Sequence, residues 1–342
     1  MNQMDPRFSL AFAKKKKEFS VPAPLAPIAD THAHLMSFWD KDSAEVIARS
    51  ALAGVRQMTT IWDPVADHRD AATYHEQLAG WIARAEDLID QALDAGAVPL
   101  RPGFSSPLLD ASWDPNPKSL LSRITFLAGV HPYGAPEYTD AVHAQVLEAL
   151  DDPLCVGVGE IGLDYHFDAE DNIEAAPHQM QMDVMARQLE VAVERDMPVE
   201  LHLRHEVDDE ERSSHTDAYD VLERVGVPAA GCVLHCFGED RATMERFCEL
   251  GCHIAFGGAA TFKRNDGVRE AFAACPLDLL LFETDCPYMA PEPVRGLECE
   301  PAMIPWTVEA LTGYRSSVTG EDPAQIAYAV WRNSLKLFGR QE

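Results

Sequence analysis

Two histidines separated by one residue, His32 and His34, are the first group in this sequence that could do chemistry. They lie at the end of an apolar stretch, residues 28–35, whose composition is typical of a β-strand. Because alternate side chains of a strand point to the same face, both imidazoles can reach one metal ion. Such pairs also occur at the ends of ordinary strands, so a metal site requires further ligands elsewhere in the chain.

Four further residues with metal-binding side chains follow later apolar stretches: Glu160, His202, His235 and Asp285. Imidazole and carboxylate together are typical ligands of divalent ions such as zinc and manganese. Six protein ligands are more than one catalytic ion uses if it keeps a position open for substrate, so the set predicts two ions. We expect Glu160 to bridge them. The other ligands would divide into two groups: His32, His34 and Asp285 on one ion, and His202 and His235 on the other.

Eight short apolar stretches are predicted to be the β-strands that position these ligands. They cover residues 28–35, 55–61, 124–131, 154–160, 198–203, 231–236, 252–256 and 279–285. Amphipathic helical patterns separate them, and two more helical patterns follow the last strand. Apolar strands that alternate with amphipathic helices indicate a parallel sheet, and eight such units predict a single (β/α)8 barrel of the TIM type. Active sites of these barrels lie at the C-terminal ends of the strands, where the six candidate ligands fall.

The chain divides into an N-terminal segment, residues 1–27, and a barrel domain, residues 28–342. The first segment combines a run of lysines with three prolines among its last six residues, which favours an extended tail over a packed element. Within the barrel, residues 63–123 are longer than a simple connection. We expect them to hold a helix at about 71–95 and an insertion rich in Pro, Ser and Asp that could cover one end of the fold.

Composition limits the possible partners. The chain has 28 Lys and Arg against 56 Asp and Glu, a net charge of −28, which argues against a broad basic surface for nucleic acid or anionic membranes. Its eight scattered cysteines are interpreted as reduced thiols, because a chain of this length needs no disulfides to hold its core. No apolar run has membrane-spanning length, and the lysine run does not lead into a signal-peptide core. We therefore expect a cytoplasmic protein without a membrane partner.

Several motifs resemble those of the TatD-type metal-dependent hydrolases, a family associated with deoxyribonuclease activity. They are DTHAHL at 30–35, GVHP at 129–132, GEIGLDY at 159–165, Gln181 and Gln188 on the following helix, HLR at 202–204, HCF at 235–237, FGGAATFK at 256–263 and ETDCPY at 283–288. The family's ligand pattern falls on the six positions already selected by spacing. The resemblance implies two divalent ions, such as zinc, manganese or magnesium, and DNA as the substrate, at single-stranded regions or exposed ends.

The same resemblance bears on two residues outside the ligand set. His131 would contact the substrate, although it could instead only close the turn before Pro132. Arg204 would bind a phosphate oxygen, or else pair with an acidic neighbour such as Glu206. The chain departs from the family pattern at Leu297, where the family carries a lysine, while the metal ligands are all kept.

The expected reaction is hydrolysis by a water that two ions activate, with Asp285 as the general base. The leading substrate is a DNA phosphodiester. An alternative keeps the metals and cleaves a small-molecule ester, lactone, amide or phosphoester, which the missing lysine and the acidic charge favour. A third possibility, a metal-binding scaffold without activity, offers no reason for six ligands to converge on one rim.

Overall fold

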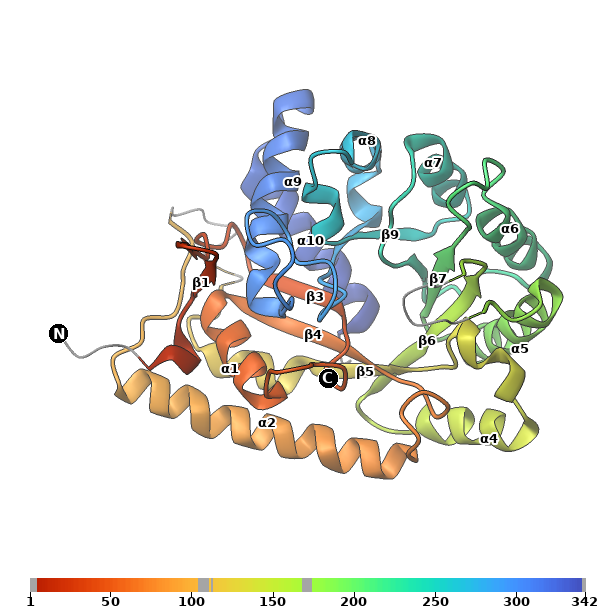
Figure 1. Cartoon of the computed structure of the whole chain (residues 1–342), viewed down its shortest axis with the longest axis horizontal. Coiled ribbons are helices and arrows are strands. Elements are labelled where there is room, and N and C mark those ends of the chain that lie inside the picture. Colours follow the sequence, from red (N-terminus) through yellow and green to blue (C-terminus); the bar gives the residue numbers. More distant parts are fainter. Residues whose placement is uncertain (1–4, 104–110, 112, 168–173, 340–342) are drawn as a thin grey trace.

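The computed structural model describes residues 5–103, 111, 113–167 and 174–339. Eight parallel strands form one sheet in which neighbours in sequence are neighbours in space (Figure 1). The strands are β3 (Ile28–Ala33), β4 (Val55–Trp62), β5 (Ile124–Ala128), β6 (Cys155–Asp164), β7 (Val199–Arg204), β8 (Cys232–Leu234), β9 (His253–Phe256) and β10 (Leu280–Phe282). Each coincides with one of the eight stretches predicted from the sequence, so the predicted strand order is confirmed.

The sheet closes into a barrel just beyond the end of β10. Ala33 of β3 forms a parallel bridge with Cys286, and the N–H of His34 donates to the carbonyl of Cys286 at 2.9 Å. The N–H of Asp285 donates to the carbonyl of His32 at 3.0 Å. These bonds join the first and last strands at their C-terminal ends, and they place two candidate ligands side by side.

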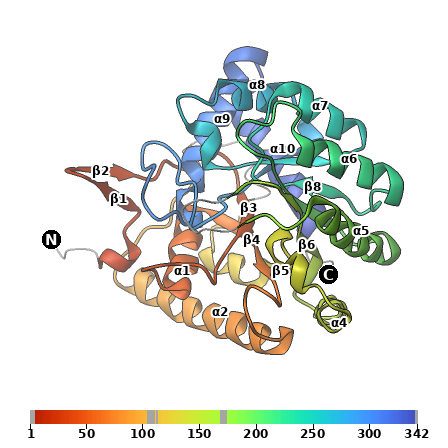
Figure 2. The same cartoon turned by 45° about the vertical axis from the view of Figure 1, so that its right-hand side comes forward.

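Helices surround the barrel (Figures 1 and 2). They are α1 (Ser43–Ala53), α2 (Ala71–Asp94), α4 (Asp140–Ala149), α5 (His178–Arg195), α6 (Ser213–Val225), α7 (Arg241–Glu249), α8 (Asp266–Ala274), α9 (Ile304–Thr319) and α10 (Pro323–Phe338). Side-chain oxygens cap several of their first turns; the Asp42 carboxylate, for example, accepts the N–H groups of Ala44 and Glu45. None of the helices in the described part of the chain combines the length and apolarity that crossing a bilayer requires.

The end of α10 closes the N-terminal opening of the barrel. Leu337 and Phe338 pack in one buried cluster with side chains of five strands, among them Leu127 and Leu281. The amide of Gln57, near the start of β4, donates to the carbonyl of Ser334 at 3.2 Å. With this end filled, the C-terminal ends of the strands are the place for a functional pocket.

The N-terminal segment differs from the extended tail predicted for residues 1–27. Strands β1 (Ala11–Lys14) and β2 (Lys17–Ser20) form an antiparallel hairpin beside the barrel (Figure 2). Phe8 is buried, and the Phe12 ring contacts Trp306 edge to face at 5.9 Å. Burial of these apolar side chains against the barrel outweighs the local preference of a lysine- and proline-rich segment for extended structure.

The long connection between β4 and β5 contains α2, as expected, and the described residues of its second half lie near the start of β4. The N–H of Leu100 donates to the carbonyl of Leu52 at 2.8 Å, and Trp113 packs under the guanidinium of Arg56 at 4.7 Å. Leu52 precedes β4 and Arg56 is the second residue of β4, so the described part of this stretch lies at the N-terminal side of the barrel, which agrees with an insertion that covers one end of the fold. Residues 104–110 and 112 of the predicted insertion lie outside the described residues.

Candidate metal centre

All six predicted ligands come together at the C-terminal rim of the barrel. His32 lies in β3 and His34 directly follows that strand. Glu160 lies in β6 and His202 in β7, while His235 directly follows β8 and Asp285 lies three residues after β10. Because neighbouring strands run parallel, their ends meet at one rim, and their side chains converge there. The rim thus collects imidazoles and carboxylates from segments that are far apart in the sequence.

The first group consists of His32, His34 and Asp285. The Nε2 atoms of the two histidines lie 2.9 Å apart. Asp285 Oδ1 lies 3.8 Å from His32 Nε2 and 3.5 Å from His34 Nε2. Two nitrogens bound to one ion at about 2.0–2.1 Å are separated by about 3 Å, so this spacing fits a shared divalent ion. Burial alone would raise the pKa of Asp285, but the hydrogen bond with His34 and the nearby imidazoles lower it to about 2.

The second group consists of His202, His235 and Glu160. His202 Nδ1 and His235 Nε2 lie 3.2 Å apart, and Glu160 Oε1 lies 2.7 Å from the former and 2.8 Å from the latter. Burial alone would lower the pKa of His202, but its hydrogen bonds to Asp164 and Glu160 raise it to about 10. Two imidazoles and a carboxylate are a donor set that suits zinc, manganese or iron.

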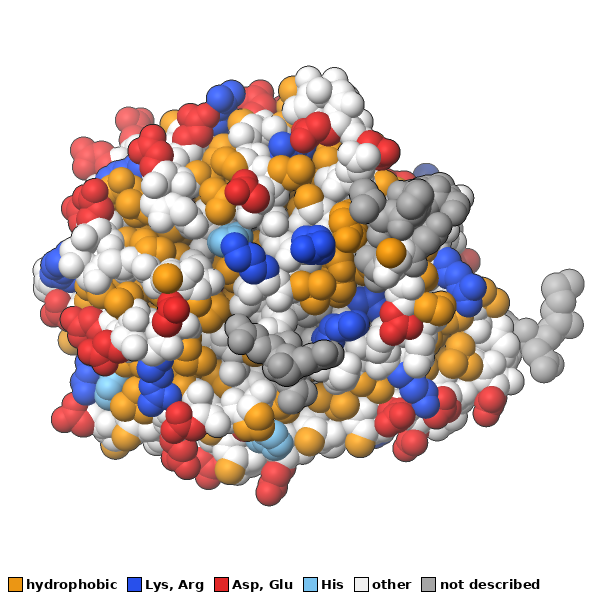
Figure 3. All heavy atoms as spheres, turned by 180° about the vertical axis from the view of Figure 1, so that it is seen from behind, with side chains coloured by type: hydrophobic (Ala, Val, Ile, Leu, Met, Phe, Trp, Pro, Cys, Tyr) orange, Lys and Arg blue, Asp and Glu red, His pale blue; other side chains and the backbone are white. Residues whose placement is uncertain are grey.

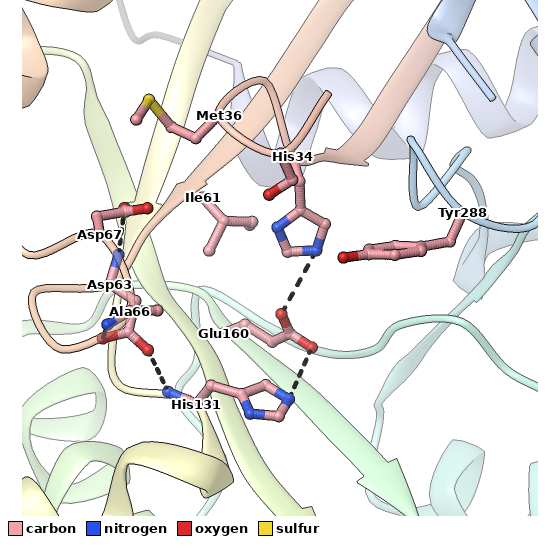
Figure 4. Close-up of a pocket in the computed structure, with 10 residues that line it drawn as sticks. His34, Met36, Ile61, Asp63, Ala66, Asp67, His131, Glu160 and Tyr288 are labelled. Carbon is pink, nitrogen blue, oxygen red and sulfur yellow. Dashed lines mark hydrogen bonds and ion pairs between the residues drawn. The ribbon is translucent and has the colours of Figure 1, made fainter. Parts of the chain in front are cut away.

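Glu160 lies between the two groups, with a different oxygen toward each. Its Oε1 atom faces the second group, whereas Oε2 lies 3.7 Å from His32 Nε2 and 3.8 Å from His34 Nε2. Figure 4 shows this carboxylate between His34 and His131. An arrangement with one oxygen toward each ligand group is what a bridging carboxylate requires.

His131 closes the turn before Pro132 and also lies beside the six candidate ligands. Its Nδ1 accepts the N–H of Tyr133 at 3.1 Å and so caps the short helix Pro132–Glu137. Its Nε2 lies 3.8 Å from Glu160 Oε1, and the ligand atoms of His131, Glu160 and His202 lie within 4.8 Å of one another. Burial lowers the pKa of His131 to about 3, so the ring is a neutral imidazole at the edge of the centre.

Arg204 lies farther from the centre. Its side chain is 44% exposed at the end of β7, and Nη1 lies 4.0 Å from Asp164 Oδ2. Glu206, considered as its partner, instead binds the ring of His166 at 3.1 Å and the N–H of Phe167 at 2.6 Å. Arg204 does not line the pocket beside the centre, so its predicted contact with a phosphate requires a substrate that extends beyond that pocket.

Two carboxylates that the sequence analysis missed hold the ligand histidines from behind. His32 Nδ1 donates to Glu200 Oε1 at 2.7 Å, and His202 Nε2 donates to Asp164 Oδ2 at 3.0 Å. Such contacts fix the orientation of the ring and present its other nitrogen to the metal. A signal was available, because Glu200 and Asp164 lie two or four residues from His202 and Glu160 on the same strands and therefore on the same face.

Two buried glutamines of α5 hold the strand ends in place. Gln188 accepts the N–H of Val130 at 2.8 Å and donates to its carbonyl at 3.1 Å. Gln181 makes the same pair of bonds with Asp164, each of 2.8 Å. These amides satisfy backbone groups just beyond the regular sheet, and so they position both the turn that carries His131 and the end of β6.

Beside the centre lies a pocket of about 180 Å³. His34, His131 and Glu160 form one wall, and Met36, Ile61, Tyr288 and two further carboxylates, Asp63 and Asp67, are among the residues that form the rest (Figure 4). Asp63 accepts N–H groups of Val65, Ala66 and His131, yet burial raises the pKa of Asp63 to about 6. These two carboxylates lie in the loop after β4 and were not among the residues predicted from the sequence.

Removal of the carboxylate behind His32 should weaken metal binding. We expect Glu200→Ala to lower the affinity for a divalent ion by ~10- to 100-fold, because the ring then loses the acceptor that orients it. Titration of metal-stripped protein against a competing chelator measures this affinity. Glu309→Ala, on the exposed face of α9, is the matched control. An unchanged affinity in Glu200→Ala would show that packing alone orients His32.

The fold agrees with comparisons to known proteins. A family model described as "TatD related DNase" matches residues 113–339. A Mycobacterium tuberculosis protein named "Uncharacterized metal-dependent hydrolase TatD" is 27% identical over 315 residues, which are 91% of this chain and 98% of that protein. A Citrobacter rodentium protein named "3'-5' ssDNA/RNA exonuclease TatD" is 32% identical over 217 residues, 62% of this chain and 76% of that protein. The crystal structure of the Escherichia coli TatD homologue YJJV has a TM-score of 0.64 at 24% identity and covers 92% of this chain and 98% of its own.

Proposed function

The chain belongs to the TatD family of metal-dependent hydrolases, and from this premise we propose that it hydrolyses phosphodiester bonds in single-stranded DNA or at exposed DNA ends with two divalent ions. The observation that carries the proposal is the position of Glu160, with Oε1 toward His202 and His235 and Oε2 toward His32 and His34. One bridging carboxylate and two separate groups of ligands are the donor set of a binuclear hydrolase. The exonuclease name of a relative supports a nucleic acid as substrate.

Divalent ions held by these ligands would polarise the phosphodiester and lower the pKa of a water. The protein supplies the remaining requirements. Asp285 has one oxygen toward His32 and His34, and we assign the acceptance of the water's proton to its carboxylate. His131, at the pocket wall, would orient a non-bridging phosphate oxygen, and Arg204 would contact a phosphate farther along the strand.

The charge distribution favours a short contact with a nucleic acid. The chain carries 56 Asp and Glu against 28 Lys and Arg, and on the face in Figure 3, acidic side chains lie mostly toward the edges. Asp63 and Asp67 lie in the pocket itself. Affinity for DNA normally comes from many Lys and Arg contacts to phosphates. Here the metal centre would be the main positive charge that a phosphate meets.

The same two carboxylates support a second candidate function, hydrolysis of a small-molecule ester, lactone, amide or phosphoester. A pocket of about 180 Å³ with Asp63 and Asp67 in its wall disfavours a substrate that brings several phosphates into it. A small uncharged or cationic substrate meets no such repulsion. The ligand set would be unchanged, because one barrel rim supports many reactions.

A substrate panel separates the two functions. Metal-stripped protein is reloaded with zinc, manganese or magnesium and assayed with a single-stranded oligonucleotide, its duplex, a p-nitrophenyl phosphodiester, a lactone and an amide. We expect metal-dependent cleavage of the single strand, with a salt dependence of binding shallower than that of proteins making ~6–10 phosphate contacts. Turnover of the lactone or amide without cleavage of either nucleic acid would support the second function. Full activity in excess EDTA would contradict both.

A further inference from the structure

Two exposed aromatic side chains lie beside the pocket of the metal centre. Trp39 is 64% exposed and Tyr288 is 46% exposed. Their ring centroids are 6.3 Å apart, and the Tyr288 ring is 6.2 Å from that of the ligand His34. Figure 4 shows Tyr288 beside His34, with its hydroxyl end directed toward the pocket. Tyr288 therefore connects the metal centre to Trp39 through a continuous row of rings.

The backbone under Trp39 is held in place. The Glu298 carboxylate accepts the N–H groups of both Trp39 and Asp40, the latter at 3.3 Å. Lys41 Nζ donates to the carbonyl of Glu298 at 2.7 Å. These three bonds tie the loop after β3 to the loop before α9. An indole that stays exposed on an anchored loop is pre-organised, so a ligand that binds it bears a smaller ordering cost.

The two rings are inclined to each other. Their planes are inclined by 65°, so they do not stack face to face on each other. Met289, which follows Tyr288, is also 46% exposed and extends the apolar surface. Exposed apolar surface next to a functional pocket is typical of a site where a ligand binds. A flat aromatic group is the ligand that an exposed aromatic ring binds by stacking.

We propose that Trp39 and Tyr288 stack the bases of the nucleotides next to the scissile phosphodiester. This inference rests on the proposed nuclease function and adds the element that recognises the strand. Stacking is tolerant of sequence, because each base has a π-face. A base inside a duplex is already stacked on its neighbours, so these rings would select single-stranded or frayed ends.

The surrounding charges are consistent with stacking as the source of affinity. Lys41, the cation nearest to Trp39 in sequence, forms an ion pair of 2.7 Å with Glu300. Asp63 and Asp67 line the pocket that Tyr288 also lines. A DNA strand that enters this pocket gains little binding free energy from phosphate contacts outside the metal centre. Base stacking on aromatic side chains supplies affinity without any net charge on the protein.

The test compares two single-stranded oligonucleotides that differ only in whether their terminal residues carry bases or are abasic. Steady-state kinetics of the metal-loaded full chain are measured for the wild type, Trp39→Ala and Trp39→Phe. We expect Trp39→Ala to raise KM for the normal strand by ~5- to 100-fold, to leave kcat nearly unchanged, and to leave KM for the abasic strand unchanged. Trp39→Phe, which keeps a stacking face, should retain most of the affinity. Val318→Ala, an exposed apolar truncation near the end of α9, is the control.

Two results would overturn the inference alone: an unchanged KM in Trp39→Ala, or an equal rise in KM for the normal and the abasic strand. The second result would mean that Trp39 acts on the shape of the loop and not on a base. A wild-type protein that cleaves neither strand, but turns over a lactone or an amide, would remove the nuclease function and the stacking assignment together. The wild type cleaves the normal strand in the first two results and cleaves no strand in the third, so failure of the stacking inference and failure of the nuclease function are distinguishable.

Discussion

Asp285→Asn is expected to reduce turnover by ~10²- to 10⁴-fold while the barrel remains folded. The substitution keeps the shape of the side chain but removes its charge and its ability to accept a proton. Asp285 Oδ1 lies 3.5 Å from His34 Nε2 and 3.8 Å from His32 Nε2, so the variant also weakens one group of ligands. Steady-state kinetics with saturating metal ion separate the loss of the base from the loss of metal affinity.

The backbone conformation at Asp285 indicates that the Asp285→Asn variant will still fold. Asp285 has a φ of 53°, and asparagine tolerates this left-handed region as well as aspartate does. Its N–H bond to the carbonyl of His32 at 3.0 Å does not depend on the side chain. Thermal unfolding of the variant should therefore be cooperative, as in the wild type. Asp278→Asn, the same substitution at an exposed position just before β10, is the control for a general effect of lost charge.

A variant that keeps more than a tenth of the wild-type rate with its metal content intact would contradict this assignment. The proton acceptor would then have to be another group in the pocket. Asp63 is the first candidate, because burial raises its pKa to about 6, close to the value that a general base needs near neutral pH. Asp63→Asn would then show the larger loss.

The sequence predicted the barrel and the ligand set for separate reasons. Strands were predicted from apolar runs, and ligands from the rule that barrel sites lie at strand ends. The candidate residues lie at one rim even where the predicted strand limits were wrong. The last strand was expected over residues 279–285 but ends at Phe282, and Asp285 reaches the rim in a turn that hydrogen bonds to β3.

The features that the sequence did not predict depend on contacts between distant segments. The β1–β2 hairpin forms beside the barrel, where Phe12 meets Trp306 and Lys14 donates to the carbonyl of Pro293 at 3.1 Å. The pocket carboxylates Asp63 and Asp67 belong to a loop whose path no periodic pattern encodes. Their position becomes visible only when β4 and β5 are placed side by side.

Glu160→Gln is expected to lower the metal content from about two ions per chain to one or fewer and to reduce activity by at least ~10³-fold. A carboxamide has one oxygen in place of two, and its nitrogen cannot serve as a ligand. One of the two groups must then lose its carboxylate oxygen. Glu160 Oε1 lies 2.7 Å from His202 and 2.8 Å from His235, and Oε2 lies 3.7 Å from His32 and 3.8 Å from His34. Elemental analysis of dialysed protein measures the stoichiometry.

The matched control for Glu160→Gln is Glu300→Gln, since Glu300 is a fully buried carboxylate outside the centre that binds Arg49 at 2.7 and 2.8 Å. That variant should lose stability but keep both ions, which separates the effect of a missing ligand from that of a missing buried charge.

If Glu160→Gln retains two ions and most of its activity, Glu160 is not the bridge. His131 would then replace it in the second group, because its Nε2 lies within ligand distance of His202. The centre would then be two independent sites, and their metal affinities would respond separately to substitution of His34 and of His235.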